Sequence, residues 1–351
     1  MAWMKFITAI LKGEFRMVVV LREKIGNLFR RQGPPETQHP FWAMVQKEAM
    51  DHINSWRFMI LLGLMLLITV ASLSTAISSL QGAIAEDTAT SFVFLKLFTA
   101  TDGSLPPFIT FISLLGPIIG IALGFDAINS ERSRGTLSRL LAQPIPRDYI
   151  INAKFVAALL IIAFMMMILG LLMVGSGILT TGIPPTPEEV WRVFFFLLIS
   201  IVYIGVWLNL AIMFSIKFKQ AATSALSGLA VWLFFSLFFT MIINIIVEST
   251  APAQVTDINE LISYQGFVQN LLRISPSQLF SEATTTLLVP TIRTLGPITM
   301  EQASYAIAGP LPLGQSLLLV WPQLICLVAA AFIIFGISYV LFMKQEVRSR
   351  S

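Results

Sequence analysis

The side chains that most often carry chemistry are few in this chain of 351 residues, and their spacing matches no catalytic or metal-binding arrangement. The two histidines, His39 and His52, have no cysteine nearby, and the single cysteine, Cys326, lies inside a long apolar run. A metal site needs several such ligands around one ion, and a single cysteine cannot form a disulfide within the chain. The sequence therefore predicts no metal site.

Sulfur ligands of another kind occur at Met165–Met167, which could suggest a path for a soft metal ion. Consecutive helical residues point about 100° apart, so three neighbours cannot converge on one ion. We therefore expect these methionines to face lipid. The sequence has no G-x-x-x-x-G-K-[ST] phosphate loop, so we expect no ATP hydrolysis by that chemistry in this chain.

The most informative spacing of charged residues, glycine and proline lies in the stretch 126–154. Gly135 permits a turn, and a short amphipathic helix is predicted over Thr136–Ala142, ended by Pro144 and Pro146. One side of that helix carries three leucines, which are Leu137, Leu140 and Leu141. If these leucines are exposed, they require a groove on a partner, or else they lie in lipid.

The elements on either side of this stretch are long apolar runs. Hydrophobic residues make up 56% of the chain and charged residues 12%, against about 25% charged in a soluble domain. A membrane helix needs roughly 20 apolar residues. We predict an all-α membrane protein whose six spans cover residues 58–80, 107–125, 155–181, 193–216, 221–247 and 316–343.

The basic residues indicate how these spans are oriented. The two termini and the loops after the second and fourth spans hold 19 of the 23 lysines and arginines, and the remaining loops hold 4. Because basic loops stay in the cytosol, both termini are predicted to be cytosolic in a multi-pass cell-membrane protein. The net charge of +4 then reflects loop sorting and anionic lipid, and we predict no nucleic-acid partner.

Three further segments have distinct patterns. Residues 1–40 form a basic extension and linker, and 41–351 form the six-span domain, which opens with an interfacial helix over Phe41–Trp56. In the outer loop, 248–315, two short helices are predicted over Ile258–Leu272 and Pro276–Leu288. The second is preceded by Ser275, which we expect to form a capping box with Gln278.

The stretch 126–154, taken with the interfacial helix and six spans, resembles the coupling loop of ABC-2-type permeases, the membrane subunits of ABC exporters. The resemblance rests on Glu131, Arg132, Gly135, Thr136, Leu137, Leu140, Leu141, Pro144, Pro146 and Arg147, with Lys154 beyond. It implies two copies of a separate ATPase subunit, which bind ATP and Mg²⁺, and a second permease copy. The residues expected to couple to the ATPase are Glu131, Arg132, Gly135, Thr136, Leu137, Arg139, Leu140, Leu141, Pro144 and Arg147.

Other functional interpretations stay open at this point. A permease of this family could energise an extracytoplasmic partner docked on 248–315 without bulk export. An ion-coupled transporter or an intramembrane enzyme would place ionisable groups within the membrane, and none of the six runs contains one. We therefore expect no enzyme and keep the ion-coupled transporter as an alternative. A charge-free interior suits lipids, hydrophobic peptides or drugs, without excluding a polar cargo.

Overall fold

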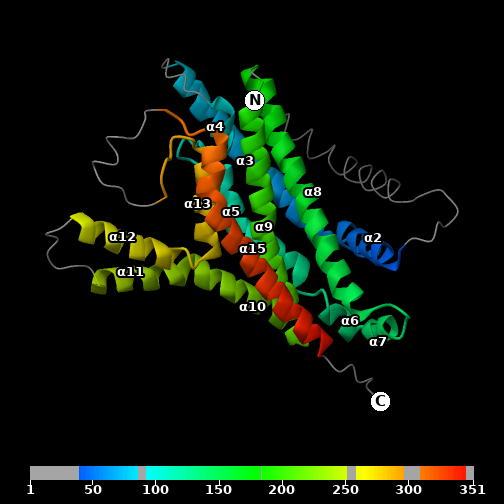
Figure 1. The fold of residues 1–351 in the computed structure, drawn as a ribbon. Helices are drawn as coiled ribbons and strands as arrows, with labels where there is room; N and C mark the ends of the chain where they lie inside the picture. The colour runs from blue at the N-terminus through cyan, green and yellow to red at the C-terminus, as the bar shows by residue number, and fades with distance from the viewer. Residues whose placement is uncertain (1–38, 86–91, 183, 251–257, 296–308, 345–351) are drawn as a thin grey trace.

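A computed structural model describes residues 39–85, 92–182, 184–250, 258–295 and 309–344 (Figure 1). Every regular element in these ranges is a helix, and six segments are long and apolar enough to cross a membrane. They run over Trp56–Ser79, Phe108–Ser133, Arg147–Thr180, Pro187–Lys217, Ala221–Thr250 and Leu313–Met343. The predicted six-span helical fold is confirmed. Most of the basic extension, residues 1–38, lies outside the described part of the chain.

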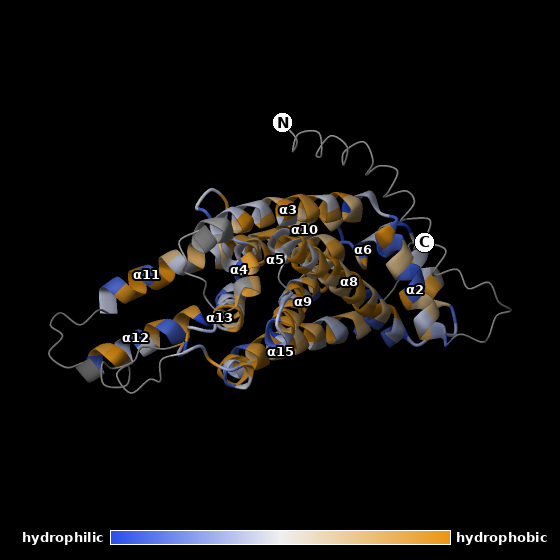
Figure 2. Cartoon of the chain, turned by 90° about the horizontal axis from the view of Figure 1, so that it is seen from above, coloured by the Kyte–Doolittle hydropathy of each residue, from blue (hydrophilic) through white to orange (hydrophobic). Residues whose placement is uncertain are grey.

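The helices are connected in a simple order. In sequence they are α2 (Pro40–Ile53), α3 (Trp56–Ala85), α4 (Val93–Thr99), α5 (Phe108–Gly124), α6 (Asn129–Ser133), α7 (Thr136–Leu141), α8 (Arg147–Thr181), α9 (Pro187–Lys217), α10 (Ala221–Leu233), the π-helix η1 (Phe234–Phe238), α11 (Phe239–Thr250), α12 (Ile258–Leu272), α13 (Pro276–Leu288) and α15 (Leu313–Met343). Figure 2 shows mainly hydrophobic residues along the long helices, with hydrophilic residues gathered on α2 and α6.

Helix α9 is the centre of the bundle. It packs against α5, α8, α10, α13 and α15. In the most apolar 18-residue stretch of this helix, 67% is buried inside the chain. The corresponding share is 6% for the fifth span, made of α10, η1 and α11, and 11% for α15. The fifth and sixth spans therefore present most of their apolar surface outward.

The close packing of α5 on α9 depends on a glycine every fourth residue, at Gly116, Gly120 and Gly124. A Cβ placed on Gly120 would lie 2.6 Å from the backbone oxygen of Ile204. Small residues at this spacing let two membrane helices approach through their backbones. The α5–α9 contact is therefore set by backbone proximity.

At the end of the bundle where α9 begins, Arg192 is fully buried. Its guanidinium donates to the carbonyl oxygens of Leu287, at 2.8 Å, and Leu311, at 2.6 Å, and pairs with Glu188 at 2.9 Å. These contacts join the start of α9 to the end of α13 and the start of α15. The sequence interpretation placed Arg192 just before a span and did not foresee this role.

The short helix α4 at the same end was also not foreseen. Phe94, Leu95, Leu97 and Phe98 on it are almost fully buried, so it is part of the core. The backbone N–H of Phe94 donates to the buried carboxylate of Glu189, at 3.0 Å. Glu189, which forms a capping box with Thr186 at the start of α9, thereby also positions α4.

Both outer-loop helices begin and end where the sequence predicts, as α12 and α13. The expected capping box on Ser275 is wrong, because its hydroxyl lies 2.8 Å from that of Ser277 and receives no bond from a backbone amide. Pro276, at the first helical position, sets the helix start instead. α13 buries one face against α5, α9 and α15, whereas α12 packs along α11 and projects from the bundle (Figures 1 and 2).

The methionine triplet also departs from expectation. Met165 and Met166 are buried, and only Met167 is substantially exposed, at 37%. The expectation that all three face lipid is wrong because α8 packs against both α3 and α9, which cover more than one side of it. Methionine fills irregular gaps in such cores.

Candidate functional site

The candidate site is the α6–α7 segment that joins the second and third spans. Its entry is fixed by α9, where the Ser215 hydroxyl accepts from the backbone N–H groups of Ile128, at 2.9 Å, and Asn129, at 3.2 Å. The same hydroxyl donates to the side-chain oxygen of Asn129. The first N–H groups of a helix have no partner within the helix, so Ser215 satisfies groups that would otherwise be unpaired in a buried place.

The turn between α6 and α7 is made by Gly135, whose φ of +70° is favourable only for glycine. Space is not the constraint, since a Cβ there would meet nothing within 4 Å. After the turn, the Thr136 hydroxyl donates back to the carbonyl oxygen of Glu131, at 3.2 Å, and to its carboxylate. α7 is thus folded against α6 and does not continue it.

A buried ion cluster joins this unit to two other helices. The Lys154 ammonium on α8 lies 2.8 Å from the Glu48 carboxylate on α2 and 3.6 Å from the Glu131 carboxylate on α6. The side chains of Lys154, Glu48 and Glu131 are 6%, 11% and 16% exposed. Charges so well shielded from water interact strongly but cost much to bury, so each depends on its partners. The cluster therefore fixes α2, α6 and α8 relative to one another.

The pKa values of two side chains on α2, Glu48 and His52, reflect this burial. Burial alone would raise the pKa of Glu48, but the neighbouring Lys154 and Lys47 outweigh it and hold that pKa below its ordinary value of 4.5. Burial lowers the pKa of His52 below its ordinary value of 6.5, so its imidazole is neutral at pH 7. The cluster therefore keeps Glu48 ionised at neutral pH, as the ion pair requires.

A second ion pair fixes the start of the same segment. Arg57, at the beginning of α3, lies 2.5 Å from the carboxylate of Asp126, directly after α5. Its guanidinium also stacks over the Phe125 ring, with 5.1 Å to the centroid. The first span is thereby connected to the base of the loop.

The leucines of α7 do not lie as expected. Leu137 is 3% exposed and belongs to the chain's own core, and Leu140 is partly buried against that core. The prediction that Leu137 is exposed to a partner groove is wrong, because the turn at Gly135 and the Thr136 bond direct this side of α7 toward the bundle. Leu140 remains partly exposed. Among the described residues from 133 to 147, the exposed ones are Ser133, Arg134, Gly135, Ser138, Ala142, Gln143, Pro144, Pro146 and Arg147.

The remaining predicted residues fall into two groups. Glu131, Gly135 and Thr136 build the turn, and Glu131 also meets Lys154. Arg132 is half-buried, and Pro144 and Arg147 are exposed. The side chains of Arg139 and Leu141 lie outside the described part of the chain. Sequence reasoning missed Glu48 and Ser215. A signal existed for Glu48, which falls three residues after the buried Val45 on the packed side of α2.

Comparison with known proteins supports a transport role. The family model described as ABC-2 family transporter protein matches residues 42–347. The chain is 29% identical over 210 residues to the "Probable ABC transporter permease protein NosY" of Stutzerimonas stutzeri, covering 58% of this chain and 68% of that relative. It is 30% identical over 207 residues to the protein of the same name from Pseudomonas aeruginosa, covering 57% and 68%.

Proposed function

Since this chain belongs to the ABC-2 family of transporter proteins, we propose that it drives export when ATP is hydrolysed on a separate ATPase subunit docked on the α6–α7 segment. As a membrane subunit of an ABC transporter it requires an ATPase partner. We further infer two ATPase copies, which hold ATP and Mg²⁺, and a second permease copy. Family membership leaves no support for the ion-coupled alternative.

The observation that carries this proposal is the way α6 and α7 are held. Ser215 of α9 and Lys154 of α8 both restrain this short unit, and Lys154 also pairs with Glu48 of α2. A force applied to α7 would therefore reach α2, α8 and α9 together. A rigid element with this many attachments can transmit motion from a docked subunit to several spans at once.

The described part of the surface available for docking is mostly polar, and its exposed charged side chains are basic. Ser138, Gln143, Pro144 and Arg147 are exposed on and after α7, and Arg134 is exposed before it. Two arginines on this surface favour an acidic groove on the ATPase, and such charge pairs contribute mainly to specificity and to the rate of association. Docking through this polar side replaces the leucine-filled groove expected from sequence.

A steric block at Ser138 tests the docking surface. Ser138→Trp adds a large ring to the exposed side of α7, and Ser281→Trp makes the same change at an exposed position of α13. The tagged chain would be purified from membranes containing its ATPase partner, and the ATPase recovered per permease would be measured. Ser138→Trp is expected to lower that ratio at least tenfold, and Ser281→Trp to leave it unchanged. Full recovery of a coupled ATPase with Ser138→Trp would exclude this surface.

The proposal also requires α6 and α7 to be cytosolic, as the distribution of basic residues predicts. Ser138→Cys and Ser104→Cys, each in a Cys326→Ser background, place single thiols at exposed positions at opposite ends of the bundle. A membrane-impermeant maleimide applied to intact cells should label only Ser104→Cys. Labelling of only Ser138→Cys would invert the orientation.

A second function within the same family is favoured by one observation. α12 packs along α11 and projects away from the bundle, with Phe267 47% exposed on it (Figure 1). Such a hairpin could transmit motion to an extracytoplasmic partner without bulk export. Phe267→Asp would then abolish recovery of that partner while the ATPase is still recovered. Unchanged recovery of every outer protein would remove this alternative.

A further inference from the structure

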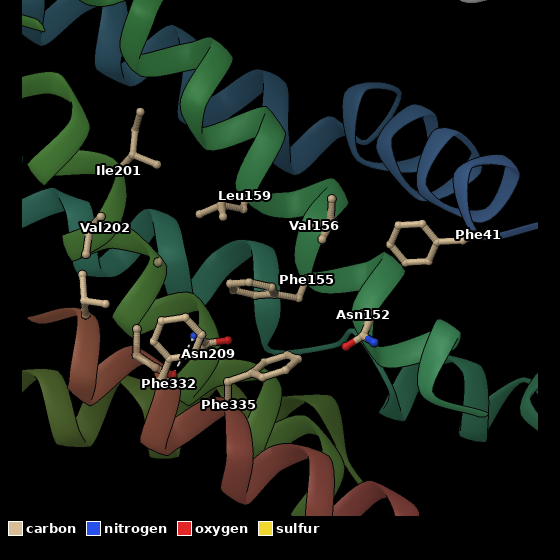
Figure 3. Close-up of a pocket in the computed structure, with 13 residues that line it drawn as sticks. Phe41, Asn152, Phe155, Val156, Leu159, Ile201, Val202, Asn209, Phe332 and Phe335 are labelled. Atoms are coloured by element: carbon tan, nitrogen blue, oxygen red, sulfur yellow. Dashed lines mark hydrogen bonds between the residues drawn. The ribbon is translucent and has the colours of Figure 1, made fainter. Parts of the chain in front are cut away.

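A pocket of about 520 Å³ lies between α8, α9 and α15, with Phe41 of α2 at one end (Figure 3). Phe155, Phe332 and Phe335 form much of its wall, and Gly205 and Leu159 also line it. Asn152 and Asn209 are its two amide residues, and none of the described lining residues is charged. A neutral apolar molecule fits such a lining, whereas an ionised group would lose its hydration without a compensating partner.

The polar group inside this pocket is the side chain of Asn209, which is 1% exposed. Its Nδ2 donates to the carbonyl oxygen of Ala331 on α15, at 3.2 Å, while its Oδ1 has no partner among the described residues. Figure 3 shows that oxygen directed into the pocket, between Phe155 and Phe335. The nitrogen and oxygen of the Asn209 amide cannot be exchanged. Oδ1 would then face the carbonyl oxygen of Ala331, and neither oxygen can donate a hydrogen bond.

An acceptor left unpaired in a buried place is costly, so Oδ1 requires a hydrogen-bond donor. Water is a poor candidate, because an ordered water needs two to four polar partners and the surrounding wall is apolar. The pocket also opens beside Phe332, which is 71% exposed among other apolar residues of α15. In a membrane-spanning chain, such a surface gives access to molecules dissolved in the bilayer.

We propose that this pocket binds a neutral lipid-like molecule that carries one hydroxyl group. The hydroxyl donates to Oδ1 of Asn209, and the hydrocarbon part lies against Phe155, Phe332 and Phe335. A pocket of about 520 Å³ is large enough to hold a hydrocarbon chain. The proposal is independent of where the ATPase docks and of the direction of transport.

The test compares two photoreactive probes that differ only in the donor. One is a long-chain alcohol carrying a diazirine in its chain, and the other is its methyl ether. The full chain, in phosphatidylcholine nanodiscs, is expected to be labelled saturably by the alcohol on α8, α9 and α15. The ether should label about fivefold less at equal concentration, the effect of one hydrogen bond.

Two variants, each with a matched control, test whether the difference in labelling arises in the pocket. Asn209→Leu removes the acceptor at similar volume, so the alcohol should label no better than the ether. Asn244→Leu, the same change at an exposed site in the fifth span, should retain the fivefold preference. Val202→Trp fills the pocket and should reduce labelling by both probes at least fivefold, whereas Ile333→Trp on the exposed side of α15 should not.

Three outcomes would overturn the proposal. Equal labelling by alcohol and ether in the unmodified chain would mean that Oδ1 receives no donor from the ligand. Labelling that never saturates would mean contact with surface lipid only. Absence of labelling would mean that the pocket is closed in the assembled protein. These three comparisons need only the unmodified chain, so they decide the matter even if Asn209→Leu fails to fold.

Discussion

Replacing Lys154 by methionine should release α2 from the bundle. The change leaves Glu48 and Glu131 buried without the ammonium that lies 2.8 and 3.6 Å from them. Removing one partner of a buried pair costs about 3–5 kcal/mol. Because both carboxylates keep some contact with water, at 11% and 16% exposure, we take the lower end. About 3 kcal/mol corresponds to a roughly 150-fold increase in the open population of α2.

The opening of α2 can be measured with one buried thiol. Val45 is 4% exposed, against Ala153 and Ala157 of α8, so Val45→Cys in a Cys326→Ser background reacts with a water-soluble maleimide only when α2 separates. We expect Lys154→Met to raise the labelling rate on the order of 100-fold. Glu48→Gln added to Lys154→Met should recover part of the loss, because it removes one of the two carboxylates that lose the Lys154 ammonium.

The pH dependence of labelling gives an independent check. In the parent, the lowered pKa of Glu48 means that its contribution is complete above its ordinary value of 4.5 and is lost as pH falls below it. His52, whose pKa burial lowers below 6.5, takes up a proton more readily when α2 opens, so opening should be flat at pH 7 to 8 and should increase as pH falls below 6.5. Without Lys154, burial raises the pKa of Glu48, and stability is lost as pH rises through the new value. Labelling of Lys154→Met, corrected for thiol ionisation, should therefore increase with pH. A change of less than threefold at every pH would refute the role of the cluster.

Three other predictions concern the packing of the bundle, and fluorescence-detected thermal unfolding of purified protein would check each. Gly120→Ala should lower the free energy of unfolding by about 1–3 kcal/mol, because the added Cβ forces α5 away from α9. Gly63→Ala should not lower it, because a Cβ at Gly63 would meet nothing within 4 Å. Arg192→Met should cost about 3 kcal/mol or more, because the carbonyls and carboxylate around the buried guanidinium lose their donor. Leu137→Ala should cost about 2–5 kcal/mol and Ser138→Ala less than about 0.5; equal effects would place Leu137 outside the core.

The sequence alone was sufficient for the six spans and for the two helices α12 and α13, but not for α4 or for the full length of α3, α8 and α9. Six apolar runs of sufficient length required six helices, because unpaired backbone groups cannot be left in hydrocarbon. α12 and α13 were predicted with the bounds observed, and α7 was predicted one residue too long. Pro276 and Gly135 act on their own backbone angles, so their effect can be predicted without the rest of the chain.

The relations between these elements were decided only by the tertiary structure. Lys154 and Glu48 are 106 residues apart, and Arg192 and Leu311 are 119 apart, so no local pattern pairs them. Leu137 shows the same limit, since an amphipathic helix has an apolar side whether that side meets a partner or its own bundle. Periodicity specifies which residues share a side, but the burial of that side depends on distant helices packing against it.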